Sequence, residues 1–110
     1  MVITMETNQD KYTESIMQMI DYCKQVLVEK HKEYAPGETR ADHYHNFQHA
    51  ARLMEVTPQQ ALAGMMVKHT VSIYDMIREA KSEPLEKWRE KIGDNINYLL
   101  ILWALVNDES

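Results

Sequence analysis

Apolar residues recur every three or four positions along most of the chain, which predicts helices rather than strands. The clearest pattern lies between residues 57 and 107, where two amphipathic stretches flank a turn at residues 81–84. The first stretch opens with Thr57-Pro58-Gln59-Gln60, a threonine suited to capping, a proline suited to the first helical turn and a glutamine three residues after the cap. Because the turn is short, we predict two antiparallel neighbouring helices. The apolar arc of the first consists of Leu62, Met65, Met66, His69, Ile73, Met76 and Ile77.

The second helix of this hairpin has an apolar stripe and a C-terminal half that is apolar on nearly all sides. The stripe consists of Leu85, Trp88, Ile92, Leu99, Trp103 and Val106, with Ile96 beside them. A helix without a polar face must be covered on every side, and three other helices of this size cover too little of it. We therefore predict a homodimer or larger homo-oligomer formed through the apolar residues 98–106. Burial at the centre of a monomeric bundle is the alternative.

Two further helices are predicted before the hairpin. Their expected bounds are Asn8 or Thr13 to Tyr34 for the first, and Tyr44 or Asn46 to Met54 for the second. Residues 1–8 are expected to be frayed. The 110 residues are too few for more than one ordinary core. The chain is therefore predicted to be a single all-α domain over residues 1–110, an antiparallel four-helix bundle completed by homo-oligomerisation.

Charge and cysteine content narrow the class of protein. The net charge of −5 argues against direct nucleic-acid binding, which normally requires a basic surface. The single cysteine, Cys23, lies on an apolar helix stripe, so we interpret it as a buried hydrophobic residue in a reducing compartment. No secretory signal and no apolar run of membrane-spanning length is present in the sequence. We expect a cytoplasmic protein without membrane contact.

Polar side chains on the two hairpin helices suggest a metal site. In an antiparallel hairpin with this turn, residues whose numbers add to about 165 lie opposite one another. Asp75 then faces the region of Glu90, and Asp94 lies one turn further along the same face. Carboxylates from neighbouring helices can bind Mg²⁺, which bridges to phosphate oxygens. The alternative is a set of solvated side chains and a surface ion pair between Lys68 and Asp94.

The histidines give a weaker signal. His45 and His49 are one helical turn apart, with His43 just before them, and such pairs can bind zinc. No cysteine and no His-Glu-x-x-His motif accompanies them. His69 lies within the apolar arc, where a neutral histidine that donates to a carbonyl is the expected role.

The order and spacing of several short motifs resemble a known family. Glu90-Lys91-Ile92-Gly93-Asp94 with the following apolar run is similar to the last helix of the MazG-like all-α nucleoside triphosphate pyrophosphohydrolases. Residues 30–107 resemble more closely the small phage and prophage domain called nucleotide modification associated domain 1. The motifs that carry this second resemblance are Lys32-Glu33-Tyr34-Ala35, His45-Asn46-Phe47, Met66-Val67-Lys68-His69, Ser72-Ile73-Tyr74-Asp75 and Asp94-x-x-Asn97-Tyr98-Leu99.

The resemblance implies a MazG-type oligomeric bundle that uses Mg²⁺ to cleave between the α- and β-phosphates of a nucleotide. The sequence departs from the MazG-like pattern at two of its carboxylate pairs. Lys91 occupies the position of a glutamate in the Glu-x-x-Asp pair, and Ser72-x-x-Asp75 occupies the position of the Glu-x-x-Glu pair.

Two classes of function therefore stay open. In the first, the protein binds and hydrolyses a nucleotide or related phosphate compound; Asp75, Glu90 and Asp94 would hold Mg²⁺ and an attacking water. The residues predicted to bind the substrate are Lys30, His45, Asn46, Lys68, Ser72 and Asn97. In the second, the protein is a non-enzymatic phage interaction protein, for example an acidic inhibitor of a host defence or nucleic-acid-handling complex. Its acidity and its eight methionines favour this second class.

Overall fold

The structure, a computed structural model, consists of helices throughout the part that it describes, which is residues 2–34, 44–79 and 82–109. Side chains are described for residues 10–29, 44–79 and 82–108. The helices are α1 (Val2–Tyr34), α2 (His45–Met54), α3 (Pro58–Glu79) and α4 (Leu85–Glu109). No strand occurs within these ranges. The predicted all-α class and the predicted packing of helices against one another are confirmed.

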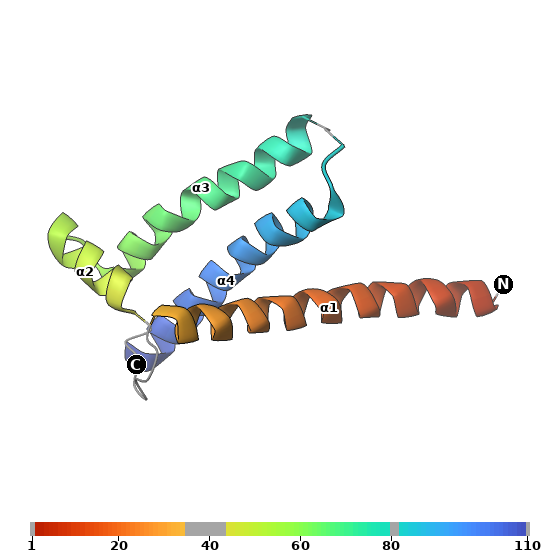
Figure 1. Cartoon of the computed structure of the whole chain (residues 1–110), viewed down its shortest axis with the longest axis horizontal. Helices are drawn as coiled ribbons and strands as arrows, with labels where there is room; N and C mark the ends of the chain where they lie inside the picture. Colours follow the sequence, from red (N-terminus) through yellow and green to blue (C-terminus); the bar gives the residue numbers. More distant parts are fainter. Residues whose placement is uncertain (1, 35–43, 80–81, 110) are drawn as a thin grey trace.

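The helices form an open arrangement around the α3–α4 hairpin (Figure 1). α2 packs on α3 at the end away from the hairpin turn, and α1 packs on α4. The N-terminal half of α1 extends away from the other helices. The Cα radius of gyration is 17.3 Å, whereas a compact domain of this length has a value of about 13 Å. The single chain therefore leaves much of its helical surface uncovered.

The beginning of α3 has the predicted capping box. The Thr57 hydroxyl oxygen accepts a hydrogen bond from the Gln60 backbone N–H at 3.1 Å, and the Gln60 side-chain oxygen accepts one from the Thr57 N–H at 2.9 Å. Two backbone donors at the helix start are thus satisfied by side chains. This reciprocal pair fixes the position at which the chain enters the hairpin.

Replacement of Thr57 by alanine is expected to lower the free energy of unfolding by about 1 kcal/mol, because one N-terminal N–H loses its acceptor. Urea unfolding followed by circular dichroism measures the change. Thr57→Ser keeps the hydroxyl and is the matched control, so it should lose much less stability. Equal losses in both variants would contradict the capping role.

Two other helix ends are informative. α1 begins at Val2, earlier than the predicted Asn8 or Thr13, because residues 2–8 contain neither glycine nor proline to end a helix. α2 ends at Glu55, which has a φ of 58° in the left-handed region. The Val56 N–H then donates to the Ala51 carbonyl at 2.9 Å. This is the Schellman pattern of a helix end, formed here without glycine.

The register of the hairpin agrees with the prediction. The Thr70 hydroxyl donates to the Asn95 side-chain oxygen at 2.9 Å, and these two residue numbers add to 165. The Asn95 amide donates to the His69 carbonyl at 3.0 Å and to the Lys91 carbonyl at 2.9 Å. The same register places Leu105, which is 2% exposed, across from Leu62, which is fully buried. The other buried apolar residues are Cys23, Phe47, Ala51, Ala61 and Met76.

The apolar stripe of α4 lies on the outside of the single chain. Trp103 is 66% exposed and Leu99 is 54% exposed. Residues 98–106 are therefore covered only in part by the single chain, with Leu105 buried and Leu99 and Trp103 exposed. Within the described residues, no helix has the length and apolar character needed to cross a membrane.

A hydrogen bond joins the beginning of α2 to the end of α4. The Tyr44 hydroxyl donates to the Asp108 carboxylate at 2.6 Å. Burial, and then the hydrogen bond and negative charge of Asp108, raise the pKa of Tyr44 to about 12. Because the pKa is higher in the folded state, this contribution to stability is fully present below pH 10. It is lost as the pH rises from about 10 through about 12.

We expect a spectrophotometric titration to show late ionisation of Tyr44 and Tyr98, because the pKa values of both are raised. The Tyr44→Phe variant should lose the part of this late ionisation that belongs to Tyr44 and should show a weaker loss of stability above pH 10. Asp108→Asn is the companion variant, because it keeps a hydrogen-bond acceptor but removes the charge. An unchanged titration in both variants would contradict the interaction.

Candidate functional site

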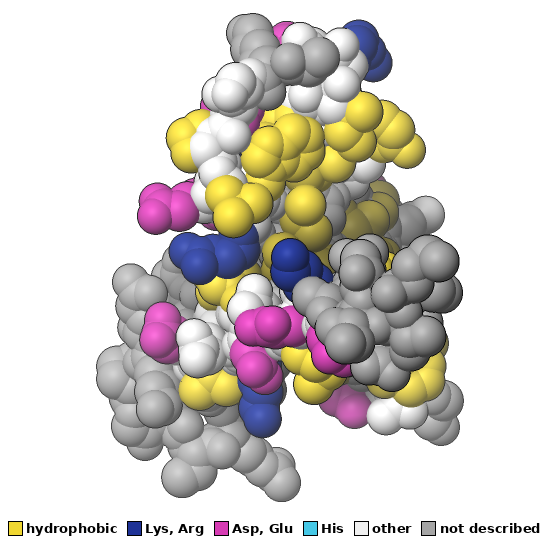
Figure 2. Space-filling model, turned by 90° about the vertical axis from the view of Figure 1, so that its right-hand side faces the viewer, with side chains coloured by type: hydrophobic (Ala, Val, Ile, Leu, Met, Phe, Trp, Pro, Cys, Tyr) yellow, Lys and Arg dark blue, Asp and Glu magenta, His cyan; other side chains and the backbone are white. Residues whose placement is uncertain are grey.

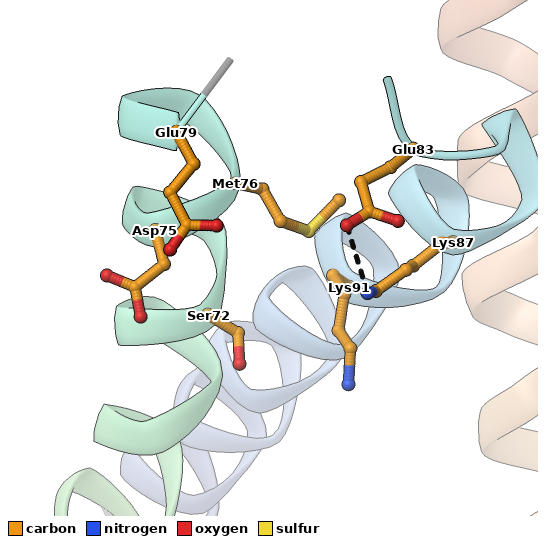
Figure 3. A pocket seen from close by; sticks show the side chains of 7 residues that line it. All are labelled: Ser72, Asp75, Met76, Glu79, Glu83, Lys87 and Lys91. Atoms are coloured by element: carbon orange, nitrogen blue, oxygen red, sulfur yellow. Dashed lines mark ion pairs between the residues drawn. The ribbon is translucent and has the colours of Figure 1, made fainter. Parts of the chain in front are cut away.

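A cleft of about 380 Å³ lies between α3 and α4 near the hairpin turn. Its walls combine carboxylates, ammonium groups, a hydroxyl and one thioether (Figure 3). The residues that line it are Ser72, Asp75, Met76, Glu79, Glu83, Lys87 and Lys91. The cleft is broadly open to solvent.

The α3 wall of the cleft is acidic, whereas the other wall has two lysines together with Glu83. Asp75 and Glu79 are one turn apart on α3, whereas Lys87 and Lys91 are one turn apart on α4 (Figure 3). Lys87 forms an ion pair with Glu83 at 3.3 Å, and Asp75 approaches Arg78 at 3.9 Å. Met76 is buried and lies between the two walls. Such a cleft can hold a ligand that carries both charges, or an anion together with a divalent cation.

The structure does not bring the three predicted catalytic carboxylates together. Asp75 lines the cleft, Glu90 is exposed and is not among the lining residues, and Asp94 lies 3.5 Å from the His69 imidazole. His69 is six residues from Asp75 on α3, which is about 9 Å along the helix axis. Among the described residues, no group of three or more His, Cys, Asp or Glu side chains could hold a metal ion.

The predicted substrate-binding residues are also dispersed. Ser72 lines the cleft, and Lys68 is exposed on α3 outside it. His45 and Asn46 begin α2, at the end of α3 away from the hairpin turn. Asn97 is 7% exposed, and its side-chain oxygen has no hydrogen-bond partner among the described residues. The side chain of Lys30 lies outside the described residues.

Among the described residues, the histidines do not form a zinc site. The rings of His45 and His49 lie with their centroids 4.0 Å apart, and both residues are exposed. His43 lies outside the described residues. His69 is largely buried as expected, but it faces the Asp94 carboxylate rather than a carbonyl and packs near Tyr98, with ring centroids 5.1 Å apart.

Asp94 is the charge at the centre of the helix crossing. Burial, and then this negative charge, raise the pKa of the Cys23 thiol and of the Tyr98 hydroxyl. Cys23 is 1% exposed and donates weakly to the Gly93 carbonyl at 3.8 Å. A thiol with a raised pKa and no access to solvent is a poor nucleophile, so the structural interpretation of Cys23 is supported.

Sequence reasoning missed the cationic wall of the cleft. Lys91 entered only as a departure from a carboxylate motif, and Lys87 and Glu83 were not considered. A signal was present, because Lys87 and Lys91 are four residues apart and the hairpin register places them across from the polar side of α3. Reading the register for both charges would have placed these two lysines opposite α3, whereas the cleft itself was evident only from the packed helices.

Comparison with protein-family models, with curated proteins and with solved structures finds no match. The resemblance to nucleotide modification associated domain 1 and to the MazG-like enzymes therefore stays a prediction.

Proposed function

We propose that this protein acts by association with other protein chains and is not a metal-dependent hydrolase. The observation that supports the proposal is uncovered surface. The chain exposes 8824 Å², about 2,500 Å² more than a compact monomer of its mass of 12.9 kDa. Large apolar side chains account for part of this surface on all four helices, among them Tyr12, Leu53, Tyr74 and Trp103.

The distribution of this surface also favours association. Hydrophobic side chains gather around the turn end of the α3–α4 hairpin (Figure 2). On α3, exposed Val67, Val71 and Tyr74 form a stripe on the side away from the buried Leu62. Helix faces of this kind are the usual contact surfaces of helical interaction proteins. The separation of Asp75, Glu90 and Asp94 argues in the same direction, because hydrolysis would require them to share one metal ion.

A two-part experiment tests the proposal. The purified chain is incubated with each canonical and modified nucleoside triphosphate and Mg²⁺, and no release of pyrophosphate or phosphate is expected. In parallel, proteins captured by the wild-type chain are compared with those captured by a Val71→Glu/Tyr74→Glu variant, which should lose the partners that bind through the exposed stripe of α3. Nucleotide turnover that Asp75→Asn abolishes would overturn the proposal.

A second candidate function is the binding of a phosphate compound in the α3–α4 cleft. The hydroxyl of Ser72 and the ammonium of Lys91 extend toward the same side of the cleft (Figure 3). Both groups can donate to phosphate oxygens, and Asp75 with Glu79 could share a Mg²⁺ ion with that phosphate. Binding without the third carboxylate would fit a nucleotide-sensing role better than a catalytic one.

Thermal shift and calorimetry with Mg²⁺-nucleotides test this second candidate. Lys91→Ala and Asp75→Asn should each remove the nucleotide-dependent shift. Lys68→Ala is the matched control, because Lys68 is an exposed lysine of the same hairpin outside the cleft. A shift that survives Lys91→Ala, or that Lys68→Ala abolishes, would exclude the cleft as the site.

A further inference from the structure

An apolar stripe runs along the whole of α4, and its two ends are left largely uncovered by the other helices. We call Leu85, Trp88, Ile92, Leu99, Trp103 and Val106 the α4 stripe. Leu85 is 83% exposed and Trp103 is 66% exposed, whereas Trp88 and Ile92 are half-buried. α1 meets α4 at Gly93, and α3 meets it at Asn95. At 100° per residue, Gly93 points about 110° away from the middle of the stripe, whereas Asn95 points only about 20° away from Trp88 and Val106, so α3 borders one edge of the stripe.

The spacings between successive residues of the α4 stripe are the same whether they are counted from its first or from its last residue. The successive separations are three, four, seven, four and three residues, a mean period of about 3.5 residues, which is that of a coiled-coil seam. A two-fold axis near Ile96 would therefore place Trp88 opposite Trp103 of the other copy, Ile92 opposite Leu99 and Leu85 opposite Val106. In this arrangement each large side chain meets another apolar side chain, as an isologous interface requires.

Charge and area also select the occupant of this face. No member of the α4 stripe is charged, so the stripe has no feature that would recognise a nucleic acid or an ionic ligand. The excess exposed surface of the single chain is 8824 Å² compared with about 6,300 Å² for a compact monomer. The difference of about 2,500 Å² is spread over the whole chain, and a standard interface buries only about 800 Å² of each partner, so the excess is sufficient for one such interface.

We infer that α4 pairs antiparallel with α4 of a second copy of this chain, about a two-fold axis near Ile96. The inference rests on the proposed function, association with other chains, and it identifies a second copy of this chain as one partner. The α4 stripe becomes the centre of the dimer core, and the α3–α4 clefts of the two copies stay on the surface.

Sedimentation equilibrium of the wild-type chain should give about twice the monomer mass of 12.9 kDa. Leu99→Glu/Trp103→Glu should convert the dimer to a monomer, because two charges would be buried in its core. Val71→Glu/Tyr74→Glu is the matched control: it adds the same charge to side chains of similar exposure on α3 and should remain dimeric. Circular dichroism confirms that each variant is helical. A wild-type monomer, or a dimer that only the α3 variant disrupts, overturns the inference.

Cysteine cross-linking tests the antiparallel geometry independently of variants that disturb folding. Ile96→Cys lies at the proposed axis and should form a disulfide-linked dimer on mild oxidation. Leu99→Cys alone should not, because two copies of residue 99 would lie about 10 Å apart along the axis. Cross-linking of Leu99→Cys with none from Ile96→Cys would overturn antiparallel pairing. Native Cys23 is buried and serves as the unreactive background.

These outcomes separate the inference from the proposed function. A monomer that also fails to turn over nucleotides overturns the α4 dimer and leaves association with a different protein as the function. Nucleotide turnover by an α4-paired dimer overturns the proposed function and supports the dimer.

Discussion

Replacement of Leu62 by alanine is expected to lower the free energy of unfolding by about 3–5 kcal/mol, the range for a fully buried leucine that leaves a cavity. Leu62 is 0% exposed, and the hairpin register places the buried Leu105 opposite it. α2 packs on the same helix through a face that includes Phe47 and Ala51. Few neighbouring side chains can move in to fill the space, because this core is small. A loss of this size is a large part of the total stability of a domain.

Leu53→Ala is the matched control for Leu62→Ala. Both substitutions remove the same atoms from a helix, but Leu53 is 86% exposed, so the expected change is within about 0.5 kcal/mol. Urea unfolding at one fixed protein concentration measures both variants, since dimer formation would make stability depend on concentration. Similar losses at the two positions would contradict the location of the core.

The second large effect is expected at the crossing of α1 and α4. A Cβ atom added to Gly93 would lie 2.7 Å from a ring carbon of Tyr22. The Tyr22 ring is itself held under the Arg89 guanidinium, 4.8 Å from the ring centroid. In Gly93→Ala, the higher helix propensity of alanine raises the free energy of unfolding by about 1 kcal/mol. Overpacking against Tyr22 should lower it by about 1–3 kcal/mol. We expect a net destabilisation and partial release of α1.

Gly64 provides the comparison for this variant. A Cβ added to Gly64 meets no atom within 4 Å, so Gly64→Ala should stabilise the fold by roughly 0.5–1 kcal/mol. The double variant Tyr22→Ala/Gly93→Ala removes the clash. It should therefore have a higher free energy of unfolding than Tyr22→Ala alone, because alanine favours the helix more than glycine does. Hydrogen exchange of α1 provides a direct measurement of its release. Stabilisation by Gly93→Ala equal to that by Gly64→Ala would show that α1 does not cross α4 here.

Local signals in the sequence were sufficient for the helices and the hairpin. The Thr57 capping box and the turn before Leu85 act over a few residues, so their outcome does not depend on the rest of the chain. The register followed from the length of the connection, and the contact between Thr70 and Asn95 agrees with it. The start of α1 was missed because nothing local ends the helix between Val2 and Thr13, and the expected fraying had no residue to cause it.

The candidate site depended on arrangements that sequence reasoning could not resolve. Asp75 and Asp94 belong to polar strips that do run along the hairpin, yet Asp94 faces His69 at a different level from Asp75. The helix face to which a residue belongs gives only the approximate direction of its side chain around the helix axis. A metal site requires ligand atoms from both helices to lie within a few ångströms of one another. The cleft walls at Lys87 and Lys91 arise from the same rotation and were recognisable only once both helices were in place.

The sequence by itself determined the helical class, the capping box of α3 and the antiparallel hairpin. These properties depend on periodicity and on interactions between residues close in the chain. Only the tertiary structure decided that α1 meets α4 at Gly93, that Leu99 and Trp103 stay exposed and that the predicted carboxylates lie apart. The physical reason is that helix rotation and crossing are set by contacts between distant residues, such as Tyr22 on Gly93, which no local pattern encodes.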